Sequence, residues 1–261
     1  MSRKISTFFR KYITPIFVNN QRIGFVVNRA HHAEIGGISP GSMPPDAKNL
    51  AEEGVVIFPF YLLKNGKADW DGMKNILTSG PYPSRSLNEN LADLNAALAA
   101  NRSGLTDLLR LVDSFRLEQV LKYMQRLRKY AATKTSETIR DYPLSEGHAI
   151  EYLDDGSKLE VRIKKNEEGY NIDFTGTDPV HKGNLNANPA IVHSVVMYVL
   201  RLMLNEDIPL NDGMLDPVEI IIPESLLNPP FPDDPFLCPA LVGGNVEVSQ
   251  RLTDTLLKAL K

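Results

Sequence analysis

Two adjacent histidines, His31 and His32, stand in the stretch NRAHHAEIGGISPGSMPP, which runs from Asn28 to Pro45. Imidazole is the commonest metal-binding side chain, and neighbouring residues at a strand's end point to opposite faces, so one ring can face inward. A histidine pair cannot complete a metal site, because such a site needs further ligands from other segments. Taken alone, the pair is either part of a metal site or a hydrogen-bonded polar turn.

Three other features could contribute to a site. Glu34 follows the histidines and could orient a ligating imidazole, or it could be a solvated acid. The loop DFTGTDPVHKGNLNANP, residues 173–189, carries short polar side chains suited both to turns and to ligand contact. Gly243 and Gly244 precede a predicted helix, where they could expose N–H groups to an anion or fit a cramped corner of the core.

Composition excludes several classes of protein. The 261 residues carry 29 basic and 32 acidic side chains, which gives no footprint for nucleic acid or an anionic membrane. The single cysteine, Cys238, excludes an intramolecular disulfide framework and favours a reducing, cytoplasmic location; we expect a buried or loop thiol. The apolar run Ala190–Leu204 is too short for a membrane span and predicts a buried helix. The sequence lacks the P-loop, the dinucleotide-binding glycine motif, C-x-x-C and H-E-x-x-H.

The first part of the chain predicts strands. Apolar runs on both sides of Asn19-Asn20-Gln21 predict a β-hairpin whose second strand is Arg22–Asn28. The segment EEGVVIFPFYLLKNG predicts a strand pair, or one long strand interrupted at Pro59, closed by the Asn65-Gly66 turn.

The middle and the end of the chain predict helices and then mixed elements. Leucines spaced by three and four residues predict a helical hairpin or three-helix arm at about 87–139, interrupted at Asn101–Gly104. After Pro143, alternating segments joined at Asp155-Gly156 predict a meander, followed by a helix at 190–204, a strand at 218–222 and a helix from about Val246. The fold class is α+β, with mixed sheets and a helical arm between β-rich segments: 1–83, 84–142 and 143–261.

Several motifs together resemble the hydantoinase B/oxoprolinase family, which also includes the large subunits of acetone carboxylases. They extend from about Arg22 to the C-terminus in the family's order: NRAHHAEIGGISPGSMPP, EEGVVI, LNENLADLNAALAANRSG, DFTGTDP with GNLNANPA, DIPLNDGMLDPVEIIIPE and GGNVEVSQR. Matches this long and numerous are very specific. We therefore expect this sequence to share the family's fold.

The resemblance implies ATP-dependent opening of a cyclic amide, such as a hydantoin or 5-oxoproline, or ATP-dependent carboxylation of a ketone. It implies a hydantoinase A-type partner that binds ATP, in a homo- or hetero-oligomer. It also implies a divalent metal, manganese or zinc, held by an upstream His-x-x-Asp and by one of the paired histidines. On this resemblance we predict His31 or His32 as a metal ligand, with His31 favoured, and Glu34 and Asn245 as catalytic. Gly243 and Gly244 become cofactor-binding candidates.

The sequence also departs from the family's pattern. No His-x-x-Asp precedes the predicted hairpin, where MSRKISTFFRKYITPIF stands instead, and few residues follow SQR. We therefore expect a chain truncated at both ends, whose metal site is incomplete and which is inactive alone. It would be a fragment or split subunit of the enzyme, or an inactive remnant that acts only in protein interaction. A serine hydrolase using Ser39 is a distant third reading.

Overall fold

The computed structural model describes residues 9–204 and 206–261. Residues 1–8 and 205 lie outside the described residues, and residues 1–8 belong to the N-terminal stretch that stands where the upstream His-x-x-Asp was expected. The chain divides into two compact units. The first comprises Met1–Val120 and Phe231–Val242, and the second comprises Leu121–Pro230 and Gly243–Lys261.

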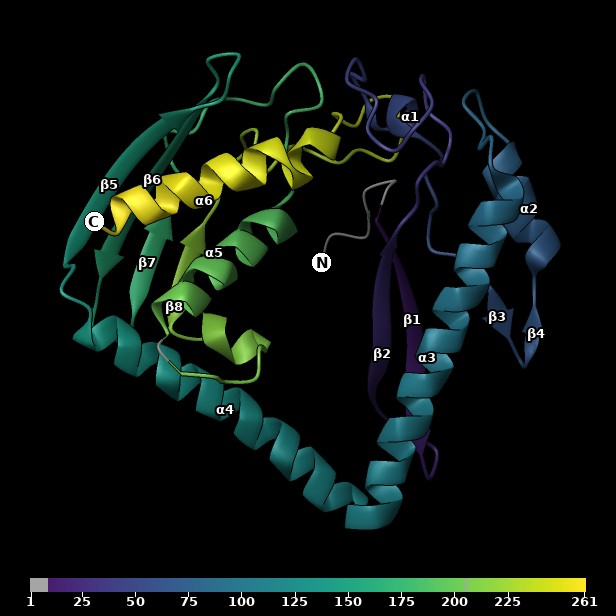
Figure 1. Ribbon diagram of the computed structural model, residues 1–261, viewed down its shortest axis with the longest axis horizontal. Helices are drawn as coiled ribbons and strands as arrows, with labels where there is room; N and C mark the ends of the chain where they lie inside the picture. The colour runs from purple at the N-terminus through teal and green to yellow at the C-terminus, as the bar shows by residue number, and fades with distance from the viewer. Residues whose placement is uncertain (1–8, 205) are drawn as a thin grey trace. The chain divides into compact units, whose positions relative to one another are not determined.

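The first unit contains the predicted hairpin. Strands β1 (Phe9–Val18) and β2 (Gln21–His31) pair antiparallel, and the register extends to Phe9 opposite His31. Asn19 and Asn20 have φ values of 49° and 62°, as a tight two-residue hairpin turn requires. Both strands contact helix α3 (Leu87–Phe115), which runs alongside them (Figure 1). The hairpin prediction is confirmed, and β2 continues as far as His31.

Helix α3 is continuous, so the predicted interruption at Asn101–Gly104 is wrong. The buried Asn101 amide donates to the carbonyl oxygen of Tyr12 at 3.1 Å and accepts from the Asn28 amide at 2.8 Å. A Cβ on Gly104 would lie 2.9 Å from a methyl group of Val26. Asn101 and Gly104 are thus the positions at which α3 contacts the hairpin. They interrupt the apolar periodicity of α3 because they make these contacts, and the helix continues past them.

The segment between β2 and α3 is mostly irregular. It contains α1 (Leu50–Glu53), β3 (Leu63–Lys64), β4 (Lys67–Ala68) and α2 (Trp70–Thr78). The Asn65-Gly66 turn joins β3 to β4, as expected. Of the strands predicted in EEGVVIFPFYLLKNG, only β3 is present, so most of that prediction is wrong. Pro59 has no N–H to donate, and no neighbouring strand pairs with residues 54–61 within the described part of the chain.

The second unit is built on a four-stranded sheet. Its order is β5 (Glu146–Tyr152), β6 (Lys158–Lys165), β7 (Tyr170–Asp173) and β8 (Val218–Ile221). The first three strands form the predicted antiparallel meander, and β8 pairs parallel with β7. Gly156 has a φ of 87° in the β5–β6 turn, the conformation that favours glycine there.

Three helices belong wholly or mainly to this unit: α4 (Leu117–Asp141), α5 (Pro189–Met203) and α6 (Glu247–Ala259). Along β6, Leu159, Val161 and Ile163 are buried, whereas Arg162 and Lys164 are exposed, as the two-residue period requires. Helices α5 and α6 contact each other, and α6 covers the buried face of β5 and β6 (Figure 1). The predicted helix at 190–204, strand at 218–222 and last helix near Val246 are confirmed to within a few residues.

The elements confirm the α+β fold class. The helical stretch predicted at 87–139 is present as two helices, α3 and α4, separated at Arg116, whose φ is 66°. The compact units do not follow the three predicted segments, because their boundary passes inside α4 and residues 231–242 return to the first unit. The irregular segment Phe231–Val242 is therefore part of the same compact unit as residues almost two hundred positions earlier.

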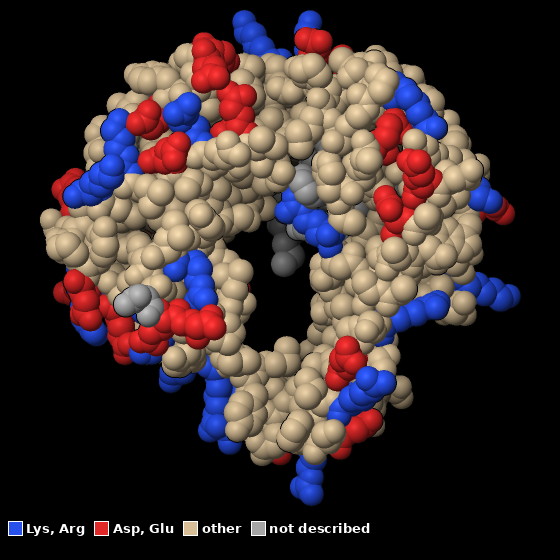
Figure 2. Space-filling view, in the orientation of Figure 1, with Lys and Arg blue, Asp and Glu red and all other residues tan. Residues whose placement is uncertain are grey.

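The surface carries charges of both signs. On the face shown in Figure 2, Lys and Arg side chains lie among Asp and Glu side chains and form no single basic patch among the described residues. Such a mixed face is unlike the basic surfaces that bind a phosphate backbone. None of the helices described is both long and apolar enough to span a bilayer.

Candidate functional site

The paired histidines at the end of β2 have different environments. His31 is exposed, whereas the side chain of His32 has an exposed fraction of 0%. The Nδ1 atom of His32 lies 3.0 Å from an Asp93 carboxylate oxygen, and its Nε2 atom lies 3.2 Å from the Tyr12 hydroxyl. The ring is thus fixed between a carboxylate from α3 and a phenol from β1. The contact between Nδ1 and Asp93 is close but lacks hydrogen-bond geometry, and it is an ion pair only when the imidazole is protonated.

The described donors do not by themselves form the predicted manganese or zinc site. Within residues 9–204 and 206–261, no group of three or more His, Cys, Asp and Glu side chains could hold a metal ion. His31 and His32 differ sharply in burial, and both ring nitrogens of His32 already face polar partners. Metal ligation by either histidine therefore stays a prediction, and it requires ligands from elsewhere.

Glu34 fastens the histidine loop to the segment that precedes α3. One of its oxygens accepts from the Gly36 N–H at 2.6 Å and from the Arg85 guanidinium at 2.9 Å. The other accepts from the Arg85 N–H at 2.8 Å and from the Ser84 hydroxyl at 3.1 Å. Burial alone would raise the pKa of Glu34, but these hydrogen bonds outweigh it and lower the pKa below its ordinary value. A carboxylate occupied on both oxygens is a poor proton acceptor, so its contacts indicate positioning, and its catalytic role stays a prediction.

The paired glycines after Glu34 let two other segments approach the loop. Gly36 and Gly37 have φ values of 87° and 95°. A Cβ on Gly36 would collide with the carbonyl oxygen of Tyr82, and one on Gly37 would lie 2.8 Å from that of Glu52. The positive φ angles and the crowding both require glycine here. The loop is therefore held in one path by Glu34 and by its glycines.

Asp93 contacts the buried imidazole and was missed by sequence reasoning. It lies in the quoted motif LNENLADLN, within the predicted helix, but its sequence separation from His32 gave no sign of contact. The helical period could have signalled it, because Asp93 neighbours the buried Asn90 and Leu94 at the end of α3 nearest the histidine loop.

Glu53 is a second missed residue. It is buried at the end of α1, and one carboxyl oxygen accepts from the N–H groups of Leu241 and Val242, each at 2.6 Å. The other oxygen is buried without a hydrogen-bond partner among the described residues. Burial raises the pKa of Glu53 to about 8, although the two amide hydrogen bonds act in the opposite direction. The side chain is therefore mainly an uncharged acid at neutral pH, and it links segments 188 residues apart.

Gly243 and Gly244 lie in the second unit, against the polar loop at residues 173–189. The Gly243 N–H donates to the Asn184 carbonyl oxygen at 3.0 Å. A Cβ on Gly243 would lie 2.8 Å from a Leu185 methyl group, and one on Gly244 would collide with the Asn186 carbonyl oxygen. These contacts favour the interpretation that the two glycines fit a crowded part of the core, because the Gly243 N–H already donates to Asn184. Cofactor binding by the two glycines stays a prediction.

The structure thus brings two of the three glycine-containing loops together in one unit and leaves the histidine loop in the other. Asn245 is half-buried, and its carbonyl oxygen accepts from the Ser249 hydroxyl at 3.1 Å in the first turn of α6. No contact of its side chain with the predicted site residues is described. Its catalytic role stays a prediction. Cys238 is buried, and its thiol lies 3.1 Å from the Pro232 carbonyl oxygen, as expected for a structural thiol.

His181 is a third residue that sequence reasoning passed over. Its Nδ1 atom accepts from the Gly183 N–H at 3.0 Å, and its Nε2 atom lies 2.8 Å from an Asp155 carboxylate oxygen. This pattern assigns the proton to Nε2. Hydrogen bonds from Ser157, first its backbone N–H, lower the pKa of Asp155, and His181 adds to the effect. The pair fixes the polar loop to the β5–β6 turn.

Comparison with solved structures defines the class of fold. The chain superimposes on an ATP-dependent caprolactamase from Pseudomonas jessenii with a TM-score of 0.78 and 21% identity, covering 98% of this chain and 44% of that one. It superimposes on nucleotide-free acetone carboxylase with a TM-score of 0.83 and 16% identity, covering 96% and 34%. At these identities the similarity shows a shared fold alone.

Sequence comparison gives the family. The profile described as hydantoinase B/oxoprolinase matches residues 11–261. The 5-oxoprolinase of Saccharomyces cerevisiae is 40% identical over 260 residues, which cover 94% of this chain and 20% of that protein. The chain belongs to the hydantoinase B/oxoprolinase family, as its motifs predicted. It spans about a fifth of the length of the 5-oxoprolinases that it matches.

Proposed function

We propose that this chain forms the hydantoinase B-type part of an ATP-dependent enzyme that opens the ring of a cyclic amide, 5-oxoproline or a hydantoin. The observation that carries the proposal is the 40% identity to a 5-oxoprolinase across 94% of the chain. Ring opening adds water across the amide C–N bond, with the hydroxyl on carbon and the proton on nitrogen. Such a reaction needs rigidly placed polar groups. Asp93 and Tyr12 fix the His32 ring, and Glu34 fixes the loop that carries it.

The proposal includes a partner for ATP. The sequence has no phosphate-binding motif, so ATP would bind to a hydantoinase A-type polypeptide. Manganese or zinc would belong to the assembled enzyme, with His31 or His32 among its ligands. We place this assembly in the cytoplasm, since a reducing compartment suits a chain with a single cysteine.

The direct test is reconstitution. The chain is mixed with a hydantoinase A-type subunit, ATP and manganese or zinc, and ring-opened product is measured from 5-oxoproline and from hydantoin. We expect ATP-dependent product in the complete mixture and none from the chain alone. A folded complex that opens no cyclic amide would contradict the proposal and favour a role in protein interaction only.

A carboxylase-type reaction is the second candidate, because the fold matches that of acetone carboxylase. Its test uses the same reconstituted mixture with acetone and labelled bicarbonate. Labelled β-keto acid, in the absence of ring opening, would replace the first proposal by the second.

The histidine pair has its own test in the assembled complex. We expect His31→Ala to abolish metal retention, measured by elemental analysis, while circular dichroism stays that of the parent chain. The matched control is His181→Ala, which changes a histidine in the other unit. Full metal content in the His31→Ala complex would refute His31 as a ligand.

A further inference from the structure

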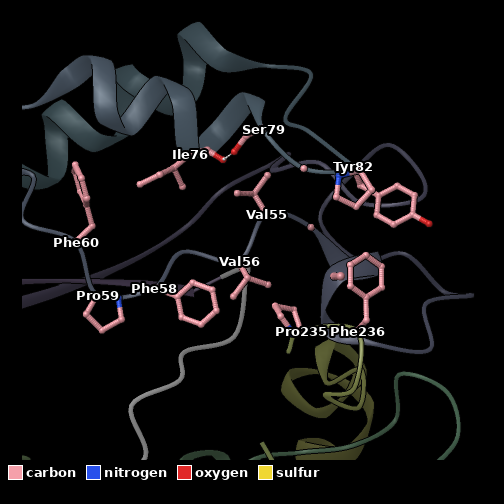
Figure 3. Close-up of a pocket in the computed structure, with 14 residues that line it drawn as sticks. Val55, Val56, Phe58, Pro59, Phe60, Ile76, Ser79, Tyr82, Pro235 and Phe236 are labelled. Atoms are coloured by element: carbon pink, nitrogen blue, oxygen red, sulfur yellow. Dashed lines mark hydrogen bonds between the residues drawn. The ribbon is translucent and has the colours of Figure 1, made fainter. Parts of the chain in front are cut away.

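Two groups of exposed apolar side chains lie outside the candidate site. In the first unit they line an open pocket of about 430 Å³, in which Phe58 and Phe236 lie on opposite sides of Val56 (Figure 3). None of the described residues that line this pocket carries a charge, so its lining selects no particular ligand. In the second unit the exposed apolar side chains form a row on α4 with basic residues beside it. Those charges do define the chemistry of a partner.

The row lies on the N-terminal half of α4. The C-terminal half packs against the core of the second unit, where Ala131, Thr135 and Ile139 are buried at a spacing of four residues. Residues 122–130 are all exposed, and this half of the helix extends beyond the strands and helices of its own unit (Figure 1). The buried face nevertheless continues toward the N-terminus through Leu127, four residues before Ala131. The helix thus carries its core-facing side into solvent.

Four large apolar side chains lie on this part of the helix. Their exposed fractions are 59% for Tyr123, 49% for Met124, 45% for Leu127 and 44% for Tyr130. Tyr123, Leu127 and Tyr130 are spaced by four and then three residues, which places them in one row, here called the apolar row. Single exposed apolar residues are ordinary, whereas a contiguous group marks an interaction surface. A row with this spacing is the face that one helix presents to another.

A second row, of basic side chains, runs beside the apolar row. Lys122, Arg126 and Lys129 have the same spacing of four and three residues, shifted by one position, and all three are exposed. We call them the basic row. One position is a rotation of about 100° about the helix axis, so the basic row borders the side that carries the tyrosines. Within the described part of the chain none of the three forms an ion pair, and the Arg126 guanidinium lies 5.7 Å from the centre of the Tyr123 ring.

The opposite border of the apolar row is already neutralised. Arg128 lies on that side, and its guanidinium is 2.7 Å from an Asp216 carboxylate oxygen and 3.9 Å from one of Asp212. The uncompensated positive charge is therefore confined to the side with the tyrosines. A helix that packed along the apolar row with acidic side chains on this side would compensate the basic row, since charges that flank an apolar seam set the choice of partner.

Two other occupants fit the charges less well. A second copy of α4, packed antiparallel across a two-fold axis, would bring the two Arg126 side chains to the same border, where like charges repel. An anionic membrane would attract the basic row, but it would repel Asp212, Asp216 and Glu206, which pair with other basic residues of the same helix. A partner helix with acidic residues on one border avoids both conflicts.

We propose that the N-terminal half of α4 is a docking surface for an amphipathic helix of a partner polypeptide. The apolar side of the partner helix would cover the apolar row, and its aspartate or glutamate side chains would pair with the basic row. This interaction goes beyond the proposed function, because it does not depend on which reaction the assembled enzyme performs.

The experiment titrates a fluorescein-labelled peptide with the full chain and follows fluorescence anisotropy. The probe is a synthetic amphipathic helix of about three heptads, with leucine at its apolar positions and glutamate on both borders. The matched peptide has lysine in place of every glutamate. We expect saturable binding of the glutamate peptide and binding of the lysine peptide that is weaker by about tenfold or more. We also expect added salt to weaken the binding of the glutamate peptide, because the paired charges are exposed.

Two pairs of variants locate the binding. Tyr123→Ala shortens the apolar row, and its control is Tyr198→Ala, which changes a tyrosine of α5 that is 54% exposed. Arg126→Glu reverses a charge of the basic row, and its control is Arg140→Glu at an exposed position near the other end of α4. We expect each row variant to weaken peptide binding by about tenfold or more and each control to leave it unchanged. Circular dichroism shows that each variant is folded.

The proposal is overturned if the glutamate peptide does not bind saturably, if the lysine peptide binds equally well, or if a folded Arg126→Glu chain binds like the parent. Two further measurements test the other occupants. Cosedimentation with phosphatidylserine vesicles that is lost in Tyr123→Ala would assign the surface to a membrane. Dimerisation in analytical ultracentrifugation that is lost in the same variant would assign it to a second copy. Either result would replace the partner helix.

Discussion

The two units are stabilised in different ways. In the second, one buried apolar cluster joins the sheet to α5 and α6, and it contains large side chains such as Leu159, Tyr170 and Phe174. In the first, the apolar clusters are smaller, and buried polar groups connect segments far apart in the sequence. His32 contacts Asp93, and Glu53 holds Leu241.

The reason for the difference lies in the backbone. A sheet pairs its own N–H and C=O groups, so apolar side chains suffice to hold it to helices. The irregular loops of the first unit have no neighbouring strand among the described residues with which to form backbone hydrogen bonds. Carboxylates therefore accept hydrogen bonds from their N–H groups. Glu34 does this for Gly36 and Arg85, and Glu53 does it for Leu241 and Val242. In the unit that carries the histidine pair, carboxylates thus accept from backbone N–H groups of irregular segments.

Glu160 in the second unit differs from Glu53 in the first, because its carboxylate is paired with side chains rather than with backbone N–H groups. Its carboxylate lies on the sheet face opposite the apolar core and is surrounded by Lys158, His148 and Arg162. These hydrogen bonds and charges, first that of Lys158, lower the pKa of Glu160. All three partners reach solvent, so they can be rehydrated when the carboxylate is removed.

The largest effect is expected for Glu53→Ala. It leaves two buried N–H groups without an acceptor, which lowers the free energy of unfolding by about 2–6 kcal/mol. Urea denaturation measures the change. The matched control is Glu52→Ala, whose carboxylate accepts from Lys48 at an exposed position and whose loss costs less than about 1 kcal/mol. If Glu53→Ala were no more costly than Glu160→Ala, the contrast between the units would fail.

In the second unit, the sensitive position is apolar. Leu159→Ala opens a cavity under α6 and lowers the free energy of unfolding by about 2–5 kcal/mol. Lys164→Ala, on the exposed face of the same strand, is the control and changes it by less than about 0.5 kcal/mol. Equal effects of the two substitutions in urea denaturation would show that the sheet is not held by its apolar face.

Glu34→Gln should have an intermediate effect, with a loss of about 1–3 kcal/mol at neutral pH, because two N–H donors and a guanidinium lose a charged acceptor. The pKa of Glu34 is lowered in the folded chain, so its stabilisation is present above the ordinary value of 4.5 and disappears as the pH falls through the folded value. The difference between parent and variant should therefore vanish in acid. A difference that grows in acid would contradict this sign.

Glu53→Gln should have the smallest effect at mildly acidic pH, because glutamine resembles the uncharged acid. The folded pKa of about 8 exceeds the ordinary 4.5. The stabilisation from this group is therefore full below pH 4.5 and is lost as the pH rises through about 8. Unfolding curves between these limits should show the parent losing stability relative to Glu53→Gln. A constant difference would mean that Glu53 stays ionised when buried.

Much of the fold could be predicted from local patterns. The hairpin followed from Asn19-Asn20 between apolar runs, and the meander followed from Asp155-Gly156 and alternating residues. Prediction failed where a tertiary contact replaced the local pattern. Asn101 and Gly104 suggested a helix end, yet they face the hairpin, and the apolar segment after Glu53 suggested a strand, yet no described strand pairs with it.

The sequence by itself determined the family, the α+β class, the paired-histidine loop and the glycines that shape it, because turn residues, periodicity and long motifs are local properties of the chain. Only the tertiary structure decided that His32 rather than His31 is the buried ring, that Asp93 lies beside it and that Glu53 links α1 to Leu241 and Val242. The burial of a side chain and its hydrogen-bond partners depend on contacts between residues up to 188 positions apart. A local sequence pattern does not predict which distant residue will make such a contact.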